Sequence, residues 1–467
     1  MPSFPPSPVL NSTRMSVSSP IAYLNLHPPS SLAVKGIRDR AASPPHVQRD
    51  ISTNSTANTY DWNVVDVNVT TLPPFYPPLE PSKSVFAPNV TPSKVAERIS
   101  RWFRQNSVAA IHDTTKTTAT ARTFDNMVFC VKLFKGDQGK DGVIVEIEPL
   151  RGCSSVYFFL DYCRPLLRAA TFPEERKGHP KQQNLTVFPP SVGRVNHLPD
   201  SISFPNKDEQ HNMEKDDENA FVALANALSL LSKDRMDANK LGIESLLLLS
   251  NPQSTDNQTA FRTAVVVLLD DASDWIAHPE LSAVGRTVHS FVYSCLVRKH
   301  FVLGFAAEHD FSEEEHPDME RLPEIVPPDD AEYMYCIRSL SLHILCNSLE
   351  LLWTDQKDII CRSPFCTNQE SIVSLLFDVD SVSRDINKAH NAALAARCLS
   401  LIMRVNAHEE SQGCRKMLVC LKDSNAAYIL QQAKDIGAQC HSALAKEAGQ
   451  TLDLLVKYAD QIHNAMA

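Results

Sequence analysis

Apolar residues recur with the 3.6-residue period of an α-helix from about residue 217 to the end of the chain. Glycine is scarce throughout, and no proline follows Pro364, so little in this half interrupts a helix. The pattern predicts helices over 217–232, 235–250, 258–271, 282–301, 333–354, 369–380, 389–406, 411–422, 425–436 and 440–465.

Two of these predicted helices are apolar on more than one side. The helix over His390–Val405 carries two apolar stripes and a narrow polar strip that includes Arg397, and Tyr333–Trp353 is similarly apolar. Such helices are expected in the inner layers of stacked helical repeats, and also at the centre of a large all-α domain. Residues 216–467 therefore resemble an armadillo or HEAT array, although their periodicity defines no clean repeat unit. The resemblance implies an extended surface for protein partners.

A small α+β module is predicted over residues 92–171, with the order helix, antiparallel strands, helix. Alternating apolar and acidic residues near residue 145 are typical of a strand with one wet face. The expected elements are a helix that starts after Thr91, strands over Thr115–Thr123, Met127–Phe134 and Val143–Glu148, and a closing helix from about Ser154 to Ala170.

This order, with the run Arg151–Ser155 leading into a Phe-rich closing helix, resembles the kinase-associated C-terminal domain. The resemblance covers only residues 92–171 and rests on pattern rather than on an invariant motif. It implies a module that binds anionic phospholipid or packs against a kinase. The chain itself carries no Gly-rich kinase loop, His-Arg-Asp or Asp-Phe-Gly sequence.

The predicted opening helix of the module is basic. Lys94, Arg98, Arg101 and Arg104 lie beside its apolar stripe. A basic amphipathic helix can lie on an anionic membrane surface, which makes these four residues candidate lipid ligands. An ordinary half-buried helix with a basic exposed face is the alternative.

Residues 1–91 are rich in Pro, Ser, Thr and Asn without sustained periodicity, so we expect a disordered tail. Within it, residues 73–76 form a PPxY sequence, which resembles the ligand of WW domains. A preformed polyproline helix loses little entropy on docking, and its Tyr fills an aromatic-lined groove. Pro73, Pro74 and Tyr76 are therefore candidate binding residues, with a plain linker as the alternative.

Charge divides the chain unevenly. The formal net charge of −10 combines +1 over residues 1–91 and +5 over 92–186 with −16 over 187–467. Because phosphate binding needs clustered Lys and Arg, we expect no nucleic acid as ligand. The most acidic segment, 306–332, holds eleven acids against Arg321 alone. This acidic loop is either solvated or a docking segment for a basic partner or a cation.

The remaining polar stretch, 172–215, contains prolines and is predicted to be a linker. Twelve cysteines are scattered through the chain, mostly within apolar runs, a usage that fits a reducing compartment. No apolar run approaches the length of about 18 residues that suggests a membrane-spanning helix. We therefore expect a cytoplasmic or nuclear protein. The first 38 residues lack acids and are Ser-rich, which keeps an organelle transit peptide as an alternative.

The run Leu375–Val382 resembles the first motif of haloacid-dehalogenase-type phosphatases, with Asp378 and Asp380 in the places of two catalytic carboxylates. That motif ends a strand which opens an α/β domain, whereas the pattern here is helical and only 85 residues follow Val382. A helix end explains the run better. No motif for a metal, nucleotide or other cofactor occurs, so we expect neither a cofactor nor an enzymatic activity.

These patterns together predict a mostly α-helical, non-enzymatic scaffold or adaptor, with a regulatory part in signalling. The helical array would dock one protein partner, and the PPxY sequence would recruit a WW-domain protein. The α+β module would tether the assembly to a kinase or to an anionic surface. The alternative is a peripheral membrane protein that binds anionic phospholipid through residues 92–171.

Overall fold

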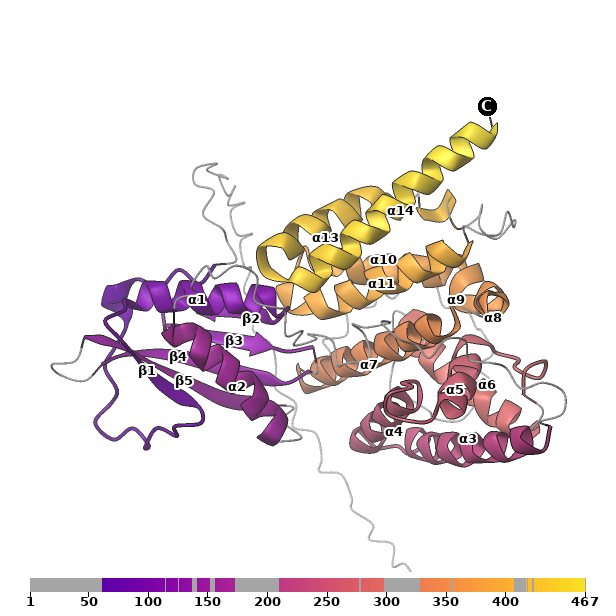
Figure 1. Ribbon diagram of the computed structural model, residues 1–467, viewed down its shortest axis with the longest axis horizontal. Helices are drawn as coiled ribbons and strands as arrows, with labels where there is room; N and C mark the ends of the chain where they lie inside the picture. The colour runs from indigo at the N-terminus through magenta and orange to yellow at the C-terminus, as the bar shows by residue number, and fades with distance from the viewer. Residues whose placement is uncertain are drawn as a thin grey trace, which may run out of the picture. The chain divides into compact units, whose positions relative to one another are not determined.

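The described part of the chain is mostly helical and contains an N-proximal antiparallel sheet (Figure 1). Three parts of the predictions lie outside the described residues: residues 1–60 of the tail predicted over 1–91, residues 173–209 of the linker and residues 306–327 of the acidic loop. The computed structural model describes residues 61–113, 115–124, 126–136, 141–151, 156–172, 210–276, 279–297, 328–353, 356–406, 417, 419–421 and 424–466.

A five-stranded sheet with the order β1-β5-β4-β3-β2 organises the first module, and all neighbouring strands run antiparallel. Side chains alternate between its two faces, so that Phe129, Val131 and Leu133 of β4 are buried on one face while Lys132 and Phe134 belong to the other. The strands are β1 (Ser84–Pro88), β2 (Ala109–Asp113), β3 (Thr118–Arg122), β4 (Val128–Lys135) and β5 (Gly142–Arg151).

Two helices, α1 (Pro92–Gln105) and α2 (Val156–Thr171), cover one face of this sheet. Phe103 of α1 and Phe159 of α2 both pack their rings against Phe129. Helix α1 begins with a proline, which has no backbone N–H. The N–H groups in the first turn of a helix have no intrahelical partner, so no hydrogen bond is lost at this position. The predicted order of helix, antiparallel strands and helix is confirmed.

The sheet has more strands than the sequence pattern indicates. Ser84–Pro88 lies in the segment assigned to the tail, yet it forms β1, and Trp62 nearby is 2% exposed. The strand expected over Thr115–Thr123 is shorter, because a turn precedes it and separates it from β2. The Asp113 carboxylate closes that turn by accepting from the backbone N–H of Thr115 at 3.0 Å.

Helices account for most of the rest of the described chain. The predicted helices are confirmed wherever they are described, although the first begins at Gln210, seven residues before its predicted start. Helix α11 packs against α7, α10 and α14, while α7 also packs against α4 and α5. The two predicted inner helices are therefore enclosed as expected. The elements are α3 (Gln210–Leu231), α4 (Met236–Leu249), α5 (Asn257–Leu268), α6 (Pro279–Val297), α7 (Pro328–Leu352), α8 (Lys357–Arg362), α9 (Pro364–Thr367), α10 (Gln369–Ser381), η3 (Ile386–Lys388), α11 (Ala389–Asn406), α13 (Ala426–Cys440) and α14 (Ser442–Met466).

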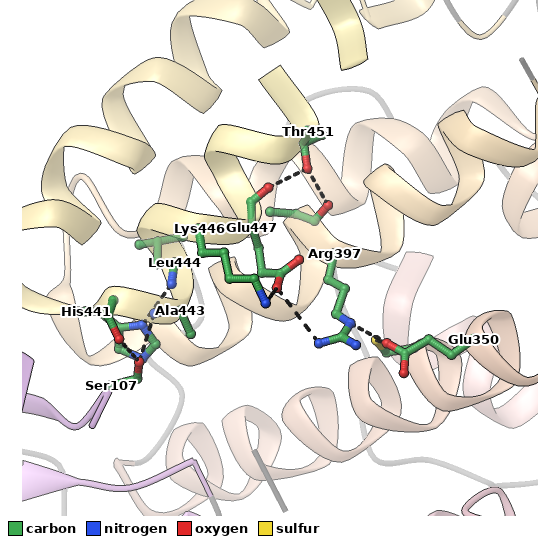
Figure 2. A network of polar contacts seen from close by, with 12 residues as sticks. Ser107, Glu350, Arg397, His441, Ala443, Leu444, Lys446, Glu447 and Thr451 are labelled. Carbon is green, nitrogen blue, oxygen red and sulfur yellow. Dashed lines mark hydrogen bonds and ion pairs between the residues drawn. The ribbon is translucent and has the colours of Figure 1, made fainter. Parts of the chain in front are cut away.

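A buried polar network joins three of these helices (Figure 2). Arg397 of α11 pairs with Glu350 of α7 and lies 3.8 Å from a carboxylate oxygen of Glu447 on α14. Burial raises the pKa of the Glu350 carboxyl, and the Arg397 guanidinium opposes this rise. Thr451 donates to the backbone carbonyl of Ala396, at 2.8 Å, across the same interface. The network fixes the register of α7, α11 and α14.

Close packing of α13 against α14 depends on Gly437. A Cβ atom at this position would lie 2.4 Å from the backbone nitrogen of Ala445, whereas one at Gly449 would meet only Lys434, at 3.6 Å. We predict that Gly437→Ala lowers the unfolding free energy by about 1–3 kcal/mol through overpacking, whereas Gly449→Ala raises it by about 0.5–1 kcal/mol. Thermal unfolding of both variants measures the contrast, and equal midpoints would contradict it.

Candidate functional site

A groove of about 1140 Å³ lies among α6, α7, α10 and η3, and the end of β3 reaches it through Arg122. Its walls therefore bring together segments that are far apart in the sequence. Its lining residues are Arg122, Cys295, Val297, Ala331, Glu332, Met334, Tyr335, Ile337, Arg338, Gln369, Glu370, Val373, Ser374, Phe377, Asp378, Ser381, Asp385, Asn387, Lys388 and Asn391.

A bidentate ion pair spans this groove from α7 to α10. The Arg338 guanidinium donates to both carboxylate oxygens of Asp378, at 2.6 and 2.7 Å, and to the backbone carbonyl of Cys295 at 3.0 Å. Burial raises the pKa of Asp378, and Arg338 opposes that rise by stabilising the charged form. The carboxylate is 5% exposed and fully engaged. It therefore holds α10 to α7 and α6 rather than offering a free base.

The structure also shows where the phosphatase-like run Leu375–Val382 lies. Asp378 lies inside helix α10, not at the end of a strand, and its two oxygens are occupied by a guanidinium. A phosphatase nucleophile would need a strand behind it and an oxygen open to substrate.

A second cluster closes the end of the groove nearest the sheet. Arg122 of β3 pairs with Glu332 at 2.7 Å, and its guanidinium lies over the ring of Tyr335, 4.9 Å from the centroid. The Tyr335 hydroxyl donates to the backbone carbonyl of Asn387 at 2.8 Å. Burial raises the pKa of Tyr335, which keeps its hydroxyl a neutral donor. Arg122 and Glu332 are thus also paired within the protein.

The outer wall of the groove is apolar and open. Val373 and Phe377 lie one helical turn apart on α10 and are 37% and 50% exposed. The guanidinium of Arg384 lies 5.6 Å from the centroid of the Phe377 ring. Helix α10 is therefore apolar on two sides, since Leu375, Leu376 and Val379 face the core.

The sequence pattern contained a signal for this wall that a search for catalytic motifs missed. The i, i+4 spacing of Val373 and Phe377 falls between the core positions of the same helix, which leaves two large apolar side chains without a place in the main stripe. The partners of Asp378 could not be foreseen, because Arg338 is 40 residues away.

Beneath the groove, two buried histidines form a hydrogen-bonded chain from the sheet module to α14. The backbone N–H of Leu444 donates to Nδ1 of His441 at 3.1 Å, and Nε2 of His441 lies 3.0 Å from Nδ1 of His390. Nε2 of His390 lies 2.9 Å from the backbone carbonyl of Arg122. A carbonyl only accepts, so each ring carries its proton on Nε2 and is neutral. Each ring nitrogen is used, which marks the chain as a structural junction.

His343 completes this cluster without a hydrogen bond of its own. Its two ring nitrogens are buried without a partner, and its ring packs edge-on against Phe124, with centroids 4.5 Å apart. Burial, followed by the nearby His390 and Arg397, lowers the pKa of His343 to about 3. Burial lowers the pKa of His390 to about 4 and that of His441 well below its usual range.

Because of these lowered pKa values, the unfolding free energy decreases as the pH is lowered. Between about pH 6.5 and pH 4 the histidines of the unfolded chain bind protons, whereas those of the folded cluster stay neutral. Each histidine then contributes a slope of about 1.4 kcal/mol per pH unit to the unfolding free energy. We predict that His343→Leu reduces this slope by about the contribution of one histidine. The unfolding free energy at pH 7 should stay equal or become higher. Denaturant unfolding at pH 7 and pH 5 measures both effects.

His289 offers a matched comparison on α6. It is also buried, its pKa is also lowered by burial, but its Nδ1 bonds to the backbone carbonyl of Val267 at 2.8 Å. His289→Leu should also flatten the slope, but it should lower stability at pH 7, because it leaves that carbonyl without its donor. An unchanged slope in His343→Leu would contradict the lowered pKa of His343.

The PPxY residues lie on the sheet module, away from the groove. Tyr76 packs edge-on against Phe134, with ring centroids 5.3 Å apart, and its hydroxyl donates to the Glu146 carboxylate. Pro73 and Pro74 are exposed, and the backbone N–H of Tyr76 bonds to the carbonyl of Pro73 at 3.0 Å. The three candidate residues are thus neighbours, with the prolines outward and the tyrosine inward.

The basic residues of α1 are mostly engaged within the module. Arg98 donates to the backbone carbonyls of Ala170 and Thr171, both at 3.1 Å. Arg104 pairs with Asp61 at 2.7 Å, and Arg101 pairs with Glu97 at 2.7 Å. Lys94 is exposed. The structure gathers these four side chains on one helix, but it assigns Arg98 to a cap at the end of α2.

Arg98 and Lys94 form a matched pair for testing that cap. We predict that Arg98→Ala lowers the unfolding free energy by about 1–2 kcal/mol, because two carbonyls at the C-terminal end of α2 lose a cationic donor. Lys94→Ala removes the same charge from an exposed position and should change stability by less than about 0.5 kcal/mol. Thermal unfolding distinguishes them, and equal effects would contradict the capping role.

Comparison with known proteins adds no identity. No protein-family model, no curated protein and no solved structure matches the chain. Among the described residues, no helix is long and apolar enough to cross a membrane. The groove, the PPxY residues and the basic helix α1 therefore have to be interpreted from their own chemistry.

Proposed function

We propose that the chain is a non-enzymatic scaffold or adaptor whose helical domain binds a segment of a partner protein in the groove. The open wall of Val373 and Phe377 beside charges that are already paired carries this proposal. A concave site with an apolar wall and a few polar groups is the usual form of a binding site, and an apolar groove between helices accepts a helix or an extended segment.

The state of the charged groups favours binding over catalysis. Acid–base or nucleophilic chemistry needs a group that is open to substrate and poised to exchange a proton. Asp378 is held by Arg338, and Glu332 is held by Arg122. The groove therefore offers a partner shape, apolar area and hydrogen bonds at its rim, where Glu370 is exposed.

The enclosed helices α7 and α11 support a layered array similar to armadillo or HEAT repeats, in which inner helices carry the core and outer helices present a surface. A second contact is supplied by Pro73, Pro74 and Tyr76, through which a WW-domain protein would be recruited. Such an adaptor, in the cytoplasm or nucleus, would bring two proteins together in a signalling assembly.

Binding of anionic phospholipid through residues 92–171 is the alternative. It is less well supported, because Arg98 and Arg104 are engaged within the module, which leaves Lys94 and the partly exposed Arg101 for a membrane. Sedimentation of the full chain with anionic and neutral vesicles discriminates the two functions. Salt-sensitive binding to anionic vesicles alone would favour the alternative.

We predict that the double variant Val373→Asp, Phe377→Asp loses the partners that co-purify with the full chain, because two carboxylates would be desolvated in the apolar contact. Leu248→Asp is the control, since Leu248 is 58% exposed on α4 and does not line the groove. Quantitative mass spectrometry after affinity purification should show partners reduced at least about 10-fold only in the double variant. Thermal unfolding verifies that both variants fold. Partners that still co-purify with the double variant would refute the groove as their binding site.

A further inference from the structure

The segment over residues 70–81 contains the PPxY residues and is called the strap below. It crosses the sheet face opposite to α1 and α2. Lys132 and Phe134 alternate along β4 with the buried Val131 and Leu133, and Glu146 is the cross-strand neighbour of Lys132. The strap is attached at its start, where the backbone N–H of Lys135 donates to the carbonyl of Thr70 at 2.8 Å. The motif is therefore part of the folded module.

Tyr76 is the inward anchor of the strap. Its ring lies against Phe134 and its hydroxyl donates to Glu146, so both its apolar and its polar ends have partners. Burial, and after it the bonded Glu146, raises the pKa of Tyr76. The hydroxyl is thereby kept as a neutral donor to a charged acceptor, which is among the stronger hydrogen bonds in proteins.

The rest of the strap faces water. The Phe75 side chain is 98% exposed, and the flanking Pro73, Pro74, Pro77 and Pro78 are exposed as well. The bond from the Tyr76 N–H to the Pro73 carbonyl closes a turn at this point. A polyproline helix has no internal hydrogen bonds, so the turn is not the conformation that an aromatic-lined groove accepts. The folded chain shows the prolines and withholds the tyrosine.

From this geometry we propose that the sheet face of Phe134 and Glu146 competes with a WW domain for Tyr76, so that recruitment requires the strap to detach. The proposal rests on the recruitment of a WW-domain protein included in the proposed function. Detachment breaks the turn, withdraws the ring from Phe134 and leaves the Glu146 carboxylate to water. The apparent affinity is then reduced by the fraction of chains in which the strap is free.

The test measures binding of a recombinant WW domain that is selective for Pro-Pro-x-Tyr sequences, by calorimetry. We expect the full chain to bind roughly 10- to 100-fold more weakly than a synthetic peptide of residues 70–81, as expected for one charge-assisted hydrogen bond and the associated packing. Glu146→Ala in the full chain should recover about 10-fold of that difference. Hydrogen exchange at the Tyr76 amide should accelerate in the same variant, without any WW domain present.

Glu148→Ala is the matched control. Glu148 lies two residues further along β5 on the same face, and it pairs with Lys132 at 2.5 Å rather than with Tyr76. Lys132 also lies close enough to Tyr76 to affect its hydroxyl, so the removal of Glu148 acts on Tyr76 only through Lys132. We expect it to change affinity and exchange much less than Glu146→Ala does. Equal affinity of full chain and peptide, or equal effects of the two variants, would overturn the competition while leaving recruitment intact. A peptide that does not bind would overturn recruitment itself, and the competition with it.

Discussion

Enclosure of α7 and α11 is the constraint on which the rest of the helical domain depends. Where an enclosed helix carries a charged side chain away from water, a neighbouring group has to neutralise that charge. Arg338 of α7 meets Asp378 of α10, and Arg397 of α11 meets Glu350 and Glu447. These pairs are worth little as net stability, but leaving one partner alone is costly. They consequently specify which helices pack together and in which register.

The groove follows from this arrangement. Its floor is the Arg338–Asp378 pair, and the same helix α10 that supplies Asp378 to the interior turns Val373 and Phe377 outward. A rigid floor with an apolar wall is a preorganised surface, which loses little conformational entropy when a partner binds. The strap over the sheet represents the opposite strategy, since Tyr76 already satisfies its groups within the protein. In the proposed function, the groove is ready for a partner, whereas Tyr76 is withheld from one.

Much of the helical domain could be predicted because its helices repeat apolar residues over several turns, and that signal is local. The five-residue strand β1 carries little such signal, and it sits beside a proline-rich segment that suggests a tail. The roles of Arg98, Asp378 and Tyr76 depended on partners 40 or more residues away, which no local pattern encodes. Residue types therefore indicated where charged groups and aromatic rings lie, but not whether these groups are engaged within the protein or available to a ligand.

The junction between the sheet module and α14 joins residues at the two ends of the described chain. Ser107 contacts Ser442, which lies 335 positions further along the chain, and His390 receives its donor from His441. During synthesis the sheet module emerges first and can fold early, because domains generally fold as units from the N-terminus. The junction cannot close until residue 441 has left the ribosome. Until then Nδ1 of His390 lacks the donor that His441 supplies, so a segment that is synthesised later completes a contact with one that is synthesised earlier.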